Sequence, residues 1–372
     1  MRNRVAHELT FKIKWNGSDG WKTLESDIVA QRGIVDRVII AKDSITYLFE
    51  RASSLDAAVA LENQVRRRQL VNVLQLISLS TDGRAPRLEE VELATGRITT
   101  NVPISQDLRA VFDEWEKVWC VNLLPQCAAK TFLSTGPIAR ALRTAGFFLL
   151  SSREPGRNEF DRFRDLWSSF NGLYSCLFEI ESSASEKSNE SQKSGGGEDA
   201  KLTCCAKTLL SETPCRVISQ NTYQVYRSEV RPVLDALSWG YHAPRSLLSR
   251  SRQPKQDVIN SVVSKAVKER LLEELDAQNS QDKNSSKLGY DDLAEKLCNA
   301  TAPDSDNRTI AFLCTRYLYD IRCNTMHGER ANRLFSFTRN PSMHPLNDLL
   351  ESCVIDCMVH IAKESDGESF EQ

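Results

Sequence analysis

The sequence predicts an α+β protein, with a small α/β module at the N-terminus followed by a mainly α-helical C-terminal bundle. Alternation of apolar and polar residues at the period-two spacing of a strand is confined to residues 1–103. From Ser105 onward, apolar residues recur at the three- and four-residue spacing of amphipathic helices. We therefore expect an N-terminal module over residues 1–103, a helical domain over 104–365 and a tail over 366–372.

Three segments of the N-terminal module are predicted to be strands. Residues 9–15 alternate between apolar and polar side chains and run into the turn sequence NGSDG. Residues 37–41 and 45–50 are rich in β-branched and aromatic side chains, which favour strands. Residues 87–101 predict a hairpin that turns at Thr95 and Gly96.

One long helix is predicted in the same module, over residues 53–80. Ser54 is placed to cap it, and apolar residues follow at helical spacing. The last turns of this segment could instead form a strand.

The helical domain begins with a helix capped by Ser105 and running to Trp119, and a second helix follows Pro137. Residues 159–180 show the clearest helical spacing, and we expect Trp167 and Tyr174 in the core rather than as stacking platforms for bases. Helices over 306–322 and 345–363 close the domain. Two strongly polar stretches, predicted to be disordered insertions, interrupt it: residues 181–200 and 276–287.

Composition narrows the functional classes. The formal net charge of −2 and the pI near 6.3 argue against a protein that coats nucleic acid through bulk positive charge. The sequence contains neither a membrane-length apolar run nor a secretory signal, so we expect a cytoplasmic protein. The 11 cysteines fit buried free thiols, because no two pairs stand at zinc-ligand spacing. We predict no metal and no cofactor.

The stretch YLYDIRCNTMHGER, residues 317–330, carries the residues that suggest chemistry. In an unbroken helix, Arg322 and His327 would lie about 140° apart around the axis. Gly328 is the residue type that commonly follows a helix end. A helix that ends between Cys323 and His327 would let the backbone turn both side chains toward one point. The negative end of the helix dipole favours a protonated His327 there, although the same residues also fit ordinary helix capping.

Two segments resemble one known family. IRCNTMHG, residues 321–328, resembles the R-x4-6-H signature of HEPN domains (higher eukaryotes and prokaryotes nucleotide-binding). It is closest to the bacterial Apea-like branch, where the stretch commonly reads IRNxxxHG. The segment FRDLWSSFNGLY, residues 163–174, is similar to the second hallmark of that branch, F-x2-LW-x2-FN-x-LY. The resemblance covers roughly residues 105–365.

The resemblance implies a metal-independent endoribonuclease whose active site forms across a homodimer, as in toxins or phage-defence effectors. RNA supplies its own nucleophile, the 2′-hydroxyl, and the products would carry a 2′,3′-cyclic phosphate. His327 would exchange protons near neutral pH. Arg322 would donate two hydrogen bonds to phosphate oxygens, and Asn324 would orient the histidine or the phosphate. The expected partners are a second copy of the chain, RNA and an antitoxin or sensor protein, with no membrane.

Four further residues are candidates for substrate binding. Asn171 is expected on the apolar face of its helix, where the motif loop could satisfy its amide; the alternative is a core amide with no direct role. Arg245, Arg250 and Arg252 lie in a basic segment that could contact phosphates or could simply be a solvated loop.

Two other interpretations stay open. Cys323 follows Arg322 where the family usually has a polar residue, often asparagine. This departure, together with the acidic pI, favours a non-catalytic HEPN module that binds nucleotide or mediates dimerisation. A helical adaptor without any site is the third interpretation, in which the motif only caps a helix.

Overall fold

The computed structural model divides the chain into two compact units. Unit 1 comprises Met1–Gly156 and Met358–Gln372, and unit 2 comprises Arg157–Cys357. The structure describes only part of each unit. The described residues are 5–16, 23–29, 35–51, 64–121, 124, 128–186, 197–209, 221, 224–225, 228, 315, 317–319, 321–322 and 343–367.

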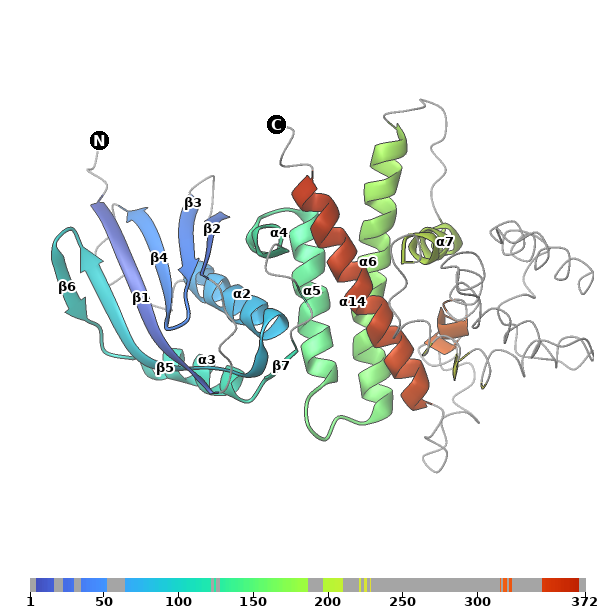
Figure 1. Ribbon diagram of the computed structural model, residues 1–372, viewed down its shortest axis with the longest axis horizontal. Helices are drawn as coiled ribbons and strands as arrows, with labels where there is room; N and C mark the ends of the chain where they lie inside the picture. Colours follow the sequence, from blue (N-terminus) through green and yellow to red (C-terminus); the bar gives the residue numbers. More distant parts are fainter. Residues whose placement is uncertain are drawn as a thin grey trace, which may run out of the picture. The chain divides into compact units, whose positions relative to one another are not determined.

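Unit 1 is built on a seven-stranded antiparallel sheet (Figure 1). The strand order is β2-β3-β4-β1-β5-β6, and β7 also pairs with β5. The strands are β1 (Val5–Asn16), β2 (Leu24–Val29), β3 (Val35–Ile40), β4 (Ser44–Arg51), β5 (Asp82–Thr95), β6 (Ile98–Asn101) and β7 (Trp119–Val121).

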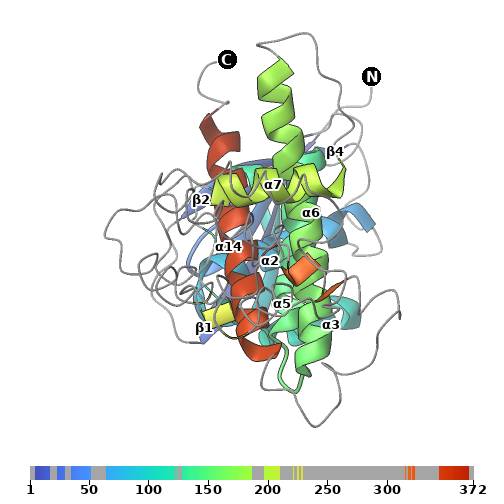
Figure 2. The same ribbon diagram turned by 90° about the vertical axis from the view of Figure 1, so that its right-hand side faces the viewer.

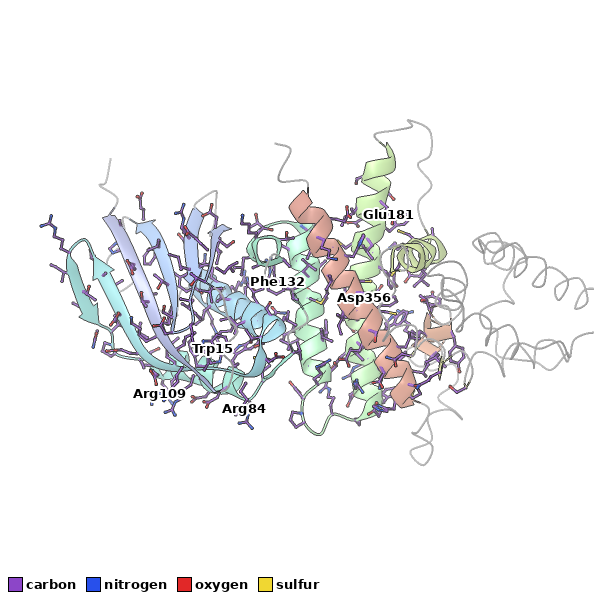
Figure 3. The ribbon with its side chains drawn as sticks, viewed as in Figure 1. Trp15, Arg84, Arg109, Phe132, Glu181 and Asp356 are labelled. Carbon is purple, nitrogen blue, oxygen red and sulfur yellow. The ribbon has the colours of Figure 1, made fainter. Side chains whose placement is uncertain are left out.

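The long strands β1 and β5 form the centre of this sheet. The side chains of His7, Leu9, Phe11 and Ile13 on one face of β1 are buried, as the alternating sequence pattern predicts, and Thr10 on the other face is buried as well. The register between β1 and β5 shifts after Lys12 and again after Lys14, and such bulges bend and twist a strand. Trp15 and Arg84 lie at this bent end of the sheet (Figure 3).

Helix α2 (Gln64–Ser80) forms a second layer against the sheet. It contacts β5 and β7 as well as helices α4 and α5. Almost every residue from Gln69 to Ser80 is buried, which explains why this segment is apolar around most of its circumference. The last turns, which the sequence left ambiguous, are helical. The predicted hairpin is confirmed, with β5 and β6 joined through Gly96 at a φ of 61°.

Three more helices belong to unit 1: α3 (Gln106–Glu116), α4 (Ala129–Leu133) and α5 (Pro137–Ser152). Ser105 caps α3 by accepting a hydrogen bond from the Leu108 backbone N–H at 3.2 Å, as expected. The prediction that this helix reaches Trp119 is wrong. Helix α3 ends at Glu116, and residues 119–121 instead pair with Asp82–Arg84 as β7.

The predicted fold class, a mainly helical bundle with a small N-terminal module, is wrong. Residues 1–156 and 358–372 form a unit organised around an antiparallel sheet, and this unit includes α3, α4 and α5. Helical periodicity shows that a segment buries one face, but it does not show which core receives that face. Helical periodicity alone therefore led to the wrong prediction that α3, α4 and α5 belong to a separate helical bundle. The sequence prediction also missed β2 and β7, whose short segments carry little pattern of their own.

Unit 2 contains α6 (Glu159–Glu186), α7 (Glu198–Leu209) and the first part of α14 (Met343–Gly367). Helix α7 crosses α6 and contacts it (Figure 2). The described residues within 315–322 are also helical. The expectation of one disordered insertion over 181–200 is wrong at both ends, since residues 181–186 extend α6 and residues 198–200 begin α7, while residues 187–196 lie outside the described residues. The second expected insertion, 276–287, lies outside the described residues.

The cysteines of the described part of the chain form no disulfide and are buried: Cys120, Cys176, Cys204, Cys205, Cys353 and Cys357. The Sγ atoms of Cys205 on α7 and Cys357 on α14 lie 3.6 Å apart. Burial, followed by the hydrogen bond and charge of Cys205, raises the pKa of the Cys357 thiol well above its usual value. No helix among the described residues is long and apolar enough to cross a membrane.

Candidate functional site

The candidate site is built on the buried face of α6. Phe163, Trp167, Phe170 and Tyr174 follow one another at intervals of three and four residues, and all four are at most 2% exposed. The ring centroids of Trp167 and Phe170 lie 5.6 Å apart, and those of Phe170 and Tyr174 lie 5.1 Å apart, both with T-shaped geometry. Trp167 and Tyr174 are therefore core residues, as the sequence predicts.

The helical residues within 315–322 pack against this face. The rings of Tyr319 and Trp167 lie 6.2 Å apart, centroid to centroid. Tyr317, Leu318 and Ile321 are buried. The helical residues that lead to Ile321 and Arg322, the described start of the second HEPN-like segment, therefore lie against the first such segment on α6.

Tyr174 connects this aromatic cluster to charged groups. Its phenol donates a hydrogen bond to the carboxylate of Glu198 at the start of α7. Burial, followed by the hydrogen bond and charge of Glu198, raises the pKa of Tyr174, while the positive charge of Arg322 acts in the opposite direction. Arg322 is half-buried and close enough to influence that phenol electrostatically. The phenol of Tyr174 and the carboxylate of Glu198 are thus in direct contact, and the charge of Arg322 acts on the same phenol.

Trp167 adds an unused hydrogen-bond donor to this region. Its indole Nε1–H is buried and has no hydrogen-bond partner among the described residues. A buried donor without a partner is costly, so it is available to an acceptor outside the described part of the chain or to a ligand.

The other predicted site residues are only partly located. Asn324 and His327 lie outside the described residues, and so do Arg245, Arg250 and Arg252. Asn171 is exposed on α6, next to the exposed Gly172. The expectation that its amide lies on the apolar face is wrong, because Phe170 and Leu173 point inward while Asn171 points to solvent. As a substrate contact, Asn171 stays a prediction.

A second polar cluster, which the sequence prediction missed, lies where the start of α6 meets the start of α14. The guanidinium of Arg162 lies 2.6 Å from Glu351, 3.2 Å from Asp348 and 3.7 Å from Glu159. Burial alone would lower the pKa of Arg162, but the hydrogen bond and charge of Glu351 and the charges of the other two carboxylates outweigh it, so the pKa is raised. His344 is 64% exposed at the edge of this cluster, and its Nε2 lies 3.6 Å from Asp348.

The signal for this second cluster is present in the sequence as helical spacing. His344, Asp348 and Glu351 stand at intervals of four and three residues, which places them on one face of α14. No group of His, Cys, Asp and Glu side chains in the described ranges could hold a metal ion. The cluster is an ion-pair network between two helices, because the charge of Arg162 is already matched by carboxylates.

Comparisons of the whole chain with protein-family models, with curated proteins and with solved structures found no match.

Proposed function

We propose that unit 2 belongs to a metal-independent endoribonuclease of HEPN type that acts as a homodimer, as a toxin or phage-defence effector. One observation supports the proposal most directly. Helix α6 and the helix that leads to Arg322 are packed together through Trp167 and Tyr319, and Arg322 acts electrostatically on Tyr174. The resemblance to HEPN domains rests on the segments 163–174 and 321–328, and a shared site requires them to lie close together, which the packing next to Arg322 supports.

In the proposed reaction, the 2′-hydroxyl of RNA attacks the adjacent phosphorus and the 5′-oxygen leaves. His327 takes the proton from the 2′-hydroxyl or delivers one to the leaving oxygen. Arg322 stabilises the additional negative charge that develops on the phosphate oxygens. Asn324 orients one of these groups. The products are a 2′,3′-cyclic phosphate and a free 5′-hydroxyl, so the cleavage step consumes no water.

The test uses the purified full-length chain and an end-labelled single-stranded RNA in buffer with EDTA. We expect cleavage, with a 2′,3′-cyclic phosphate on the upstream product by mass spectrometry. His327→Ala should abolish cleavage, whereas His344→Ala, which removes an exposed histidine of the ion-pair network, should leave it unchanged. Equal cleavage by the wild type and His327→Ala would contradict the assignment. A monomer by light scattering would contradict the dimeric site.

A non-catalytic HEPN module that binds nucleotide or mediates dimerisation is the second candidate. It is favoured by Cys323, which stands where the family usually has a polar residue. On this interpretation the wild type binds ATP in calorimetry and does not cut RNA. The variant Cys323→Asn then shows whether this position alone prevents catalysis. If it does, the variant should cut RNA; if the module is non-catalytic for other reasons, the variant should bind ATP and still not cut RNA.

A further inference from the structure

Unit 1 contains a cavity that the proposed ribonuclease function does not use. Its volume is about 490 Å³, which is within the range of pockets that hold small molecules. It lies where α3 ends and where α5 ends, and the turn after α5 completes its wall. The described residues that line it all belong to unit 1, and its apolar wall includes Trp115, Val118, Phe147 and Leu150.

The apolar part of the lining is aromatic and incompletely covered. Phe147 is 59% exposed, although most large hydrophobic side chains of the described residues are buried. Phe148 supports its ring, with centroids 5.6 Å apart in T-shaped geometry. Trp115 lines the same cavity and is half-buried. Two aromatic side chains at a cavity therefore offer ring faces and edges that a flat apolar molecule could cover.

The charged part of the lining is balanced. Glu114 and Glu154 are matched in number by Lys117 and Arg153, and all four are exposed. The C-terminal ends of α3 and α5 both lie at the cavity, and helix C-termini carry partial negative charge. A net anion would therefore meet no excess of positive charge in the lining and would be disfavoured by the two helix ends.

From this lining we propose that unit 1 carries a binding site for an uncharged, planar aromatic compound of two or three fused or linked rings. The rings cover Phe147 and contact Trp115, Leu150 and Val118, and burial of their apolar surface provides the affinity. The mixed charges stay at the solvent-exposed mouth. This site lies within the sheet unit and does not depend on the ribonuclease assignment of unit 2.

A matched pair of fluorescent probes tests the chemistry of the ligand. N-phenyl-1-naphthylamine is uncharged, and 1-anilinonaphthalene-8-sulfonate has the same ring system with an added sulfonate. We expect saturable fluorescence enhancement of the uncharged probe by the full-length chain, and an affinity at least tenfold weaker for the sulfonate. No saturable binding of the uncharged probe, or tighter binding of the sulfonate, would overturn the proposal.

Variants locate the site. Phe147→Ser should weaken binding of the uncharged probe at least tenfold, while Phe147→Trp, which restores an aromatic face, should bind within about threefold of the wild type. Ile98→Ser is the matched control, because Ile98 is 69% exposed on β6 and does not line the cavity. Equal weakening by Phe147→Ser and Ile98→Ser would place the probe elsewhere and refute the site. Loss of dimerisation in Phe147→Ser would make the patch a self-association surface and would also refute it.

Discussion

Gly146 on α5 is the position where the packing of unit 1 leaves least room. A Cβ atom added there would lie 2.6 Å from Cδ1 of Leu79 and 2.8 Å from Nε2 of Gln75, both on α2. Both atoms are ends of flexible side chains, but their surroundings restrict how far they can move. Leu79 is fully buried, and the Gln75 amide is buried and donates a hydrogen bond to the carbonyl of Arg143 at 2.5 Å. The substitution Gly146→Ala therefore pushes α5 away from α2 or breaks that hydrogen bond.

Two destabilising contributions and one stabilising contribution set the expected change in the free energy of unfolding. Overpacking a buried contact costs about 1–3 kcal/mol. Loss of the Gln75 hydrogen bond adds about 1 kcal/mol where the amide is displaced. The higher helix propensity of alanine returns about 1 kcal/mol. We expect Gly146→Ala to lower the free energy of unfolding by about 1–3 kcal/mol.

Gly172 on α6 supplies the control. It is exposed and helical, and an added Cβ meets no atom within 4 Å among the described residues. Gly172→Ala should therefore raise the free energy of unfolding by about 0.5–1 kcal/mol, the propensity difference alone. Urea unfolding of the full chain, followed by circular dichroism at the helical band, measures both. A stabilised Gly146→Ala, or the same change in both variants, would refute the argument from close packing.

Three further predictions concern unit 2. Arg162→Ala should lower the free energy of unfolding in urea by about 3 kcal/mol, because it leaves the buried carboxylate of Glu351, which is 7% exposed, without its cation. The double variant that also carries Glu351→Ala should recover part of this loss. Tyr174→Phe should cost about 1 kcal/mol by removing the hydrogen bond to Glu198. The pKa of Tyr174 is raised in the folded state, so its contribution to stability is fully present below its unfolded pKa of about 10 and declines above that pH. The free energy of unfolding of Tyr174→Phe should therefore fall less steeply above about pH 10 than that of the wild type. Arg322→Lys keeps the positive charge but loses the paired donors of the guanidinium. In the proposed ribonuclease it should reduce cleavage at least about 100-fold, with a stability change below about 1 kcal/mol. Unchanged cleavage would show that Arg322 does not bind the phosphate.

Local elements of the fold were predictable wherever the pattern and a capping signal agreed. Ser105, Pro137 and the spacing of 159–180 each marked a helix that the structure contains. Such signals are local, because a cap or a repeat of apolar positions acts within one or two turns. The extent of the sheet was less predictable. Trp119–Val121 continues an apolar stripe in the sequence, yet it pairs with Asp82–Arg84, a contact that only the tertiary structure specifies.

In the candidate site, the sequence predicted the positions of the aromatic residues better than those of the polar residues. Aromatic residues at helical spacing identified the buried face of α6 correctly, because burial follows from apolar character. Asn171 was assigned to that face wrongly. It lies between two inward-pointing residues along the sequence, but an adjacent position on a helix is rotated by about 100°. Glu198 was missed because its partner Tyr174 lies on another helix, and no spacing rule connects the two.

Arg162 and Arg322 illustrate why the surroundings of a cation, rather than its presence, decide where an anionic substrate can bind. Arg162 is held by three carboxylates within 3.7 Å, so the cluster carries a net negative charge even when His344 is protonated. A phosphate at the start of α6 would be repelled, and its binding would require Arg162 to leave Glu351 partly buried and unpaired. Arg322 instead lies near a phenol whose carboxylate partner, Glu198, already accepts a hydrogen bond from that phenol. An RNA strand that reaches Arg322 should therefore avoid the acidic ends of α6 and α14, and removing the charge of Asp348 there should weaken that repulsion without touching the proposed catalytic residues.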